Sequence, residues 1–115
     1  MDPVSSILIL KSLDGLSARS AATAQNIANS GTQGYRPLRV TFEDALRVAA
    51  RTDLSTLNQV QPKLELAPNL QGQGPGMRLD LELATAAQTA GRYGALIEVL
   101  SRQLQLDSTA ISGGR

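Results

Sequence analysis

The chain has 115 residues, with 11 basic and 10 acidic side chains and a formal net charge of +1. The length is that of one domain, and the balanced charge gives no basic field for binding nucleic acid. Because the sequence contains no Cys and no His, it lacks thiolate and imidazole ligands, disulfide bonds and the commonest general base. We therefore expect no enzyme, no cofactor, no metal site and no small-molecule substrate.

The first predicted element is a long helix over residues 3–29. Asp2 is a suitable cap, and Pro3 fits the first helical position. Apolar and small residues then recur at alternating steps of four and three, which is heptad spacing. The large residues of this seam, which we expect to pair with another helix, are Ile9, Leu13, Leu16 and Ile27.

The start of the chain has no basic segment followed by an apolar stretch and a cleavage site, so we expect no cleavable signal. Its longest apolar run there covers residues 7–10, far below the roughly 20 residues that a membrane-spanning helix needs. The sequence therefore predicts a protein that does not span a membrane.

Residues 26–35 form the predicted turn at the end of this helix. Asn and Gly tolerate left-handed backbone, and Asn and Ser side chains bond to nearby backbone groups. Each of these residue types is common in ordinary helix exits, and only their order is distinctive. The residues of this turn motif are Asn26, Ile27, Ala28, Asn29, Thr32, Gly34 and Tyr35.

The middle of the chain is predicted in two parts. Residues 30–52 contain the turn, an extended segment and one short helix. Residues 53–78 are rich in Pro, Gly and uncharged polar residues, so we expect a long loop with at most one short strand near residues 64–66. The glycines at alternate positions in 72–76 do not form a phosphate loop, since Pro75 interrupts them and no lysine follows at the required spacing.

A second long helix is predicted over residues 79–108. Its apolar residues repeat by seven in two series, which favours pairing with the first helix in an antiparallel, coiled-coil-like arrangement. The expected fold is all-α, with two long terminal helices, a short central helix and a long extended loop. The pairing and assembly residues expected here are Leu83, Ala90, Tyr93, Ile97, Leu100 and Leu104.

The paired helices bring few large apolar side chains for the number of residues that they must order. We therefore expect the terminal helices to be marginal in an isolated chain and to become ordered when copies of the same or related chains pack against them.

The order of residues in the turn motif resembles the N-terminal motif of the bacterial flagellar axial proteins. The likeness extends over both ends of the chain, and is closest to the flagellar basal-body rod proteins, in particular the proximal rod subunit next to the inner-membrane ring. Gln33 stands where members of that family commonly have Pro. The segments that carry the resemblance are Asn26-Ile27-Ala28-Asn29, Thr32, Gly34-Tyr35, Val40-X-Phe42-Glu43, Leu79-Asp80-Leu81-Glu82, Arg92-Tyr93-X-Ala95-Leu96 and Leu100-Ser101-Arg102-Gln103.

The resemblance implies a structural subunit that assembles helically through its terminal helices into the hollow drive shaft of the flagellum, which transmits torque and passes exported proteins. It implies a place in the periplasmic rod of the basal body, reached from the cytoplasm without a cleaved signal peptide. The implied partners are copies of the chain, other rod proteins, the adaptor between rod and membrane ring, and the flagellar type III export gate.

Two other functions fit the residues. The chain could be another flagellar axial subunit, because the turn motif is shared by that whole class. It could also be a soluble helical-hairpin adaptor or chaperone, which would fold and remain monomeric or dimeric when dilute.

Overall fold

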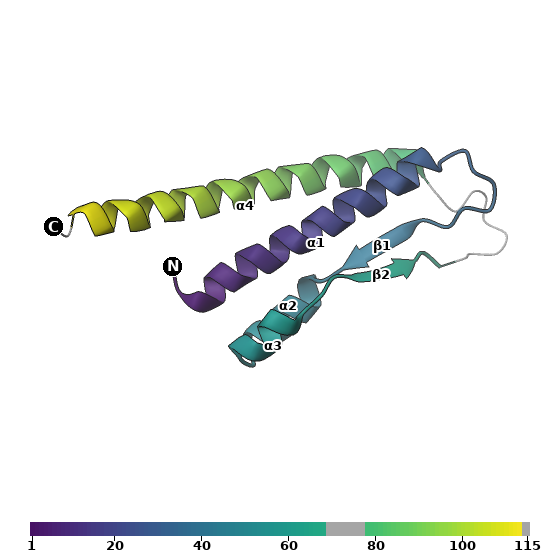
Figure 1. Cartoon of the computed structure of the whole chain (residues 1–115). Helices are drawn as coiled ribbons and strands as arrows, with labels where there is room; N and C mark the ends of the chain where they lie inside the picture. The colour runs from purple at the N-terminus through teal and green to yellow at the C-terminus, as the bar shows by residue number, and fades with distance from the viewer. Residues whose placement is uncertain (69–77, 114–115) are drawn as a thin grey trace.

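The structure is a computed structural model, and it describes residues 1–68 and 78–113 of the chain. Two long helices lie side by side, and a small strand-and-helix unit packs along one of them (Figure 1). The elements in chain order are α1 (Pro3–Ala28), β1 (Leu38–Thr41), α2 (Glu43–Ala50), α3 (Leu54–Gln59), β2 (Lys63–Leu66) and α4 (Leu79–Gly113).

The two long helices are antiparallel, as expected. The end of α1 contacts the start of α4, where Asn26 donates a hydrogen bond to Glu82, and the amino group of Met1 lies 3.9 Å from a carboxylate oxygen of Asp107. The molecule measures 67 × 28 × 14 Å, so it is a thin slab rather than a globule. The C-terminal part of α4 continues past the start of α1 (Figure 1).

α1 begins as the sequence predicts. The Asp2 carboxylate accepts a hydrogen bond from the backbone N–H of Ser5 at 2.8 Å, and Pro3 occupies the first helical position. The helix ends at Ala28, one residue earlier than expected, and Asn29 caps it.

The middle segment is more ordered than predicted. The expected loop over 53–78 contains the helix α3, capped by Asp53, and the strand β2, which pairs antiparallel with β1 from Leu38↔Leu66 to Thr41↔Lys63. The fold is therefore mostly helical but not strictly all-α, and it has two short central helices rather than one. Residues 69–77, the rest of that predicted loop, lie outside the described residues.

The hydrophobic core lies between α1 and the strand-and-helix unit rather than between the two long helices. Phe42 lies directly against Gly15 of α1. A Cβ atom at Gly15 would lie 2.4 Å from the Phe42 ring, so the absence of a side chain there permits this packing. The buried members of the core are Leu16, Ala22, Val40, Phe42, Leu46, Ala49 and Leu57.

Candidate assembly site at the helix exit

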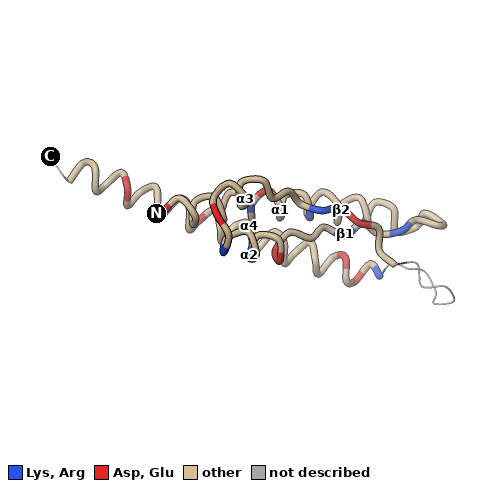
Figure 2. The backbone as a smooth tube through the Cα atoms, turned by 90° about the horizontal axis from the view of Figure 1, so that it is seen from below, with Lys and Arg blue, Asp and Glu red and all other residues tan. Residues whose placement is uncertain are grey.

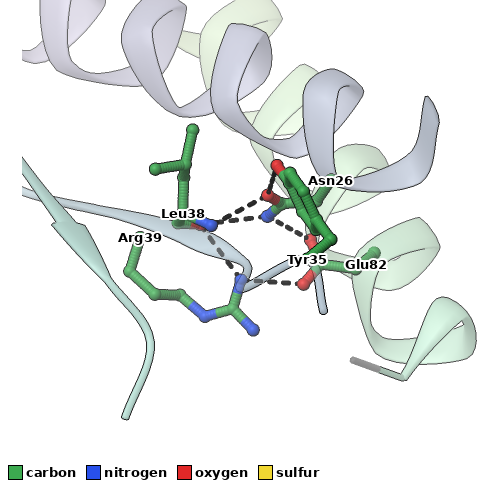
Figure 3. Close-up of polar contacts among 5 residues, drawn as sticks. All are labelled: Asn26, Tyr35, Leu38, Arg39 and Glu82. Carbon is green, nitrogen blue, oxygen red and sulfur yellow. Dashed lines mark hydrogen bonds and ion pairs between the residues drawn. The ribbon is translucent and has the colours of Figure 1, made fainter. Parts of the chain in front are cut away.

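Asn26 is the centre of the turn motif, and its side chain is completely buried. Its Nδ2 donates to the carbonyl oxygen of Leu38 and to Oε2 of Glu82, both at 3.0 Å. Its Oδ1 accepts from the backbone N–H of Leu38 and from the Tyr35 hydroxyl, both at 2.8 Å (Figure 3). These four bonds use the two donors and two lone pairs that an amide side chain has.

The two hydrogen bonds between the Asn26 side chain and the Leu38 backbone resemble the pairing of a neighbouring strand. Asn26 donates to and accepts from the backbone of one residue, as a neighbouring strand would in an antiparallel sheet. The outer edge of β1 is thus paired with a side chain of α1. Tyr35 closes the same site from the turn, so α1, the turn and β1 are held together by one amide.

Glu82 connects α4 to this group. Its side chain is only 3 % exposed, and its two oxygens accept hydrogen bonds from Asn26 and from Arg39 Nη1, the latter at 2.7 Å. Arg39 also donates to the carbonyl oxygen of Leu38. A buried carboxylate needs such partners to offset its loss of hydration. We call Asn26, Tyr35, Leu38, Arg39 and Glu82 the Asn26 network (Figure 3).

The remaining residues of the turn motif shape the backbone. The Asn29 side chain donates to the carbonyl oxygen of Gln25 and accepts from the Thr32 hydroxyl, and the Thr32 carbonyl accepts from the N–H of Tyr35. Gly34 has a φ of +79°, which favours glycine. Together these contacts turn the chain so that Tyr35 reaches back to Asn26.

Not every residue of the motif takes part in these contacts. Ile27 is half-buried, and Ala28 is exposed. Gln33 is also exposed. The polar residues of the motif and Gly34 therefore account for its geometry, and nothing in the structure explains the Ala28 position.

The pairing residues predicted in α1 lie wholly or partly inside the molecule. Leu13 and Leu16 are buried, and Ile9 and Ile27 are half-buried. Leu16 belongs to the core that α1 shares with the strand-and-helix unit, so the predicted pairing of these residues with the second long helix stays a prediction.

Most of the residues predicted to pair in α4 are exposed within one chain. Leu83, Ala90, Tyr93, Ile97 and Leu104 are exposed, and of the predicted set only Leu100 is half-buried. The residues that face α1 lie one position earlier: Glu82 and Thr89 are buried, and Leu96 is half-buried. One residue is a rotation of about 100° around the helix axis. With this rotation Glu82 points inward, where it accepts hydrogen bonds from Asn26 and Arg39.

A second polar contact, missed by the sequence analysis, joins α1 to the start of α2. Arg19 donates to both carboxylate oxygens of Glu43, at 2.7 and 2.8 Å, and to the carbonyl oxygen of Val40 at 2.7 Å. Its guanidinium also lies 4.8 Å from the centre of the Phe42 ring. These hydrogen bonds from Arg19 lower the pKa of Glu43 to about 2.

α4 also reaches this second contact, since Arg92 lies 3.8 Å from Glu43. Sequence patterns could have drawn attention to Glu43, Glu82 and Arg92, because all three stand in segments that the sequence analysis singled out. No pattern in a single sequence indicates which arginine each acid binds.

Among the described residues, no group of three or more acidic side chains could hold a metal ion. No helix in the described part of the chain is long and apolar enough to cross a bilayer. Comparisons of the chain with protein-family models, with curated proteins and with solved structures give no match. The hydrogen bonds at the helix exit form a polar junction that joins α1, β1 and α4.

Proposed function

We propose that this chain is a structural subunit of the bacterial flagellar basal-body rod, closest in kind to the proximal rod subunit next to the inner-membrane ring. It assembles helically with copies of itself and with other rod proteins through its terminal helices. It acts in the periplasm, after export through the flagellar type III gate.

The observation that carries the proposal is that most residues of the turn motif take part in one hydrogen-bonded junction. Asn26, Asn29, Thr32, Gly34 and Tyr35, the polar residues and glycine through which the chain resembles the axial proteins, all have a specific role in the same junction. An ordinary helix exit needs a cap and a turn, but not a buried amide that joins three segments.

The exposed apolar residues of α4 support an assembling protein as well. An isolated monomer gains nothing from keeping Leu83, Ile97 and Leu104 in water while Glu82 and Thr89 are buried. A subunit that covers its long helices with neighbouring subunits does gain from that rotation.

The decisive experiment is deletion of the gene in the source bacterium, with motility and purified basal bodies as the measurements. We expect non-motile cells without complete rods, restored by the wild-type gene. A gene that encodes Asn26→Ala should restore motility poorly, whereas Asn58→Ala, which changes an exposed Asn outside the motif, should restore it fully. Deletion cells that swim and carry complete basal bodies would contradict the proposal.

A soluble adaptor remains the second candidate, because the strand-and-helix unit and α1 share a buried core within one chain, with Leu57 fully buried. Such a protein would leave the basal body intact when deleted. It would also be absent from purified rods of wild-type cells, where a rod subunit must be present.

A further inference from the structure

Two contacts define the position of α4 along α1, which we call the register. Asn26 donates a hydrogen bond to Glu82 near one end of the helix pair, and the amino group of Met1 lies 3.9 Å from Asp107 near the other. Asn26 and Met1 are as far apart in the sequence as Glu82 and Asp107, so one register holds along the whole pair. In this register α1 lies opposite residues 80–105.

The lengths of the two helices do not select this register. α1 has 26 residues and α4 has 35, so the last part of α4 runs past the start of α1 (Figure 1). A displacement of α4 by seven residues, or about 10 Å, would place residues 87–112 opposite α1. All of these residues belong to α4, so α1 would still have a helix beside it along its whole length.

The apolar spacing of α4 does not select the register either. Two series of residues repeat by seven along this helix, and a seven-residue displacement moves each series onto itself. A polar contact at a single position is one means by which paired helices select a register. The two repeating series are Leu83, Ala90, Ile97 and Leu104, and Ala86, Tyr93 and Leu100.

The charged residues of α4 follow no such repeat. They are few along the helix (Figure 2), and no two of them are separated by a multiple of seven. Glu82 is one of them, and its buried carboxylate accepts hydrogen bonds from Asn26 and Arg39. A seven-residue displacement would put Thr89 in its place. Because Thr89 has no carboxylate, Arg39 would then lose its ion pair.

Arg92 adds a second contact of opposite sign. Its Nη1 lies 3.8 Å from Oε2 of Glu43, at the start of α2. The same displacement would put Val99 there, so Glu43 would lose this contact. Along α4 an acid is thus followed by a base, and each meets its opposite on the rest of the chain. A displacement by whole heptads restores neither ion pair.

We propose that Glu82 and Arg92 form a register lock, which selects one of the registers that the repeating series of α4 permit. The lock sets how far the end of α4 extends past α1, and with it the distance of the exposed Leu104 and Ile111 from the core. It belongs to the single chain, so it goes beyond the proposed rod function and does not rest on it.

Crosslinking between introduced thiols reports the register, because the chain has no Cys of its own. Ser20 and Ala90 are exposed and line the same groove between α1 and α4, so Ser20→Cys with Ala90→Cys is the observed-register pair. Ser20→Cys with Ile97→Cys is the displaced-register pair, because Ile97 takes the place of Ala90 after the displacement. A short thiol crosslinker should favour the observed-register pair by about tenfold, because Ile97 lies about 10 Å farther along the helix.

Glu82→Thr with Arg92→Val removes the lock, because it gives each position the residue type that stands seven positions later. Both registers then offer the same side chains to Arg39 and Glu43, and we expect the preference for the observed-register pair to disappear. Glu98→Thr with Arg102→Val is the matched control, because it makes the same substitutions in an exposed ion pair of α4. The control should keep the wild-type preference.

Moving the lock by one heptad is the stricter test. Thr89→Glu and Val99→Arg, added to the chain without the lock, place an acid and a base where they meet Arg39 and Glu43 only in the displaced register. The preference should then reverse, so that the displaced-register pair gives most of the crosslinked product. A purely structural role of Glu82 and Arg92 would not produce this reversal.

The register lock is overturned if the chain without it keeps the wild-type preference, or if moving the lock does not reverse that preference. Circular dichroism on each variant completes the test. Equal crosslinking of both pairs together with a loss of helicity would also overturn the proposal, since the two residues would then be needed for folding and not for the choice of register. The rod function is judged separately, by the deletion strain.

Discussion

Asn26 joins α1, β1 and α4 through a single side chain, and this makes it the residue on which the geometry of the helix exit depends most. Replacing it with Ala would leave the backbone N–H and carbonyl of Leu38, the Tyr35 hydroxyl and one oxygen of Glu82 without that partner. Water can replace an exposed hydrogen bond but reaches a buried group poorly.

We therefore expect Asn26→Ala to lower the free energy of unfolding by about 3 kcal/mol. Urea denaturation followed by circular dichroism measures this change. Asn29→Ala is the control, because it removes two exposed hydrogen bonds, and should cost less than about 1 kcal/mol. Equal effects of the two substitutions would mean that the Asn26 network does not hold the fold together.

Glu43 gives the molecule a dependence on pH that can be predicted in sign. Arg19 holds the pKa of this carboxyl group at about 2 in the folded state, below its ordinary value of 4.5. The contribution of Glu43 to stability is therefore complete above pH 4.5 and is lost as the pH falls from there through 2. Because Glu43 is 42 % exposed, solvent screening limits this contribution to on the order of 1 kcal/mol.

Thermal melts of Glu43→Gln at several pH values test this. The variant should be less stable than the wild type at pH 7, and the difference should shrink as the pH approaches 2. Asp44→Asn, which changes the adjacent and 89 % exposed carboxylate, should track the wild type across the same range within about 0.5 kcal/mol. A difference for Glu43→Gln that does not change with pH would contradict the role given to Arg19.

Among the elements, α4 is the one whose buried face the sequence analysis misplaced. Heptad spacing finds apolar residues that repeat by seven, but it does not state which of two adjacent series faces the partner helix. Here a buried acid, Glu82, decides the rotation, and it does so through residues 26 and 39, which are far away in the sequence. Such a contact depends on the fold and leaves no local signal.

The two substitutions Leu96→Ala and Ile97→Ala distinguish the observed rotation from the expected one. Leu96 packs against the core, so its truncation should cost about 1–2 kcal/mol. Ile97 is 39 % exposed, so its truncation should cost about 0.5 kcal/mol in a dilute monomer. Equilibrium unfolding at low protein concentration makes the comparison, and a larger loss for Ile97→Ala would support the predicted seam instead.

The other elements were predictable to different degrees. The start of α1 and the antiparallel pairing follow from Asp2, Pro3 and the apolar spacing, which are local or periodic signals. α3 was missed, and β2 was expected only as one short strand near residues 64–66 inside a loop, because polar residues interrupt the sequence over 53–66 and each element is too short to show a period. β2 is stable only because β1 pairs with it, and all four of its side chains are exposed.

At the scale of the whole molecule, the two long helices differ in how much of their surface is buried against other elements. The strand-and-helix unit and α1 share a buried core, whereas α4 contacts α1 through a few polar and half-buried residues and then continues alone. The expectation that both terminal helices are marginal in a monomer therefore needs refinement. α1 packs against the shared core, whereas the C-terminal end of α4, residues 104–113, packs against no other described element.

Amide hydrogen exchange on the dilute chain should follow that distribution, because protection depends on how far the structure must open around each amide. We expect slow exchange in α1 near Leu16, intermediate exchange in α4 near Thr89, and rates close to those of an unfolded peptide in residues 104–113. In assembled material residues 104–113 should become protected if, as the proposed function expects, neighbouring subunits cover Leu104 and Ile111. Uniform protection along α4 in the monomer would mean that residues 104–113 are stable by themselves, and the main physical reason for expecting neighbouring subunits to cover them would be removed.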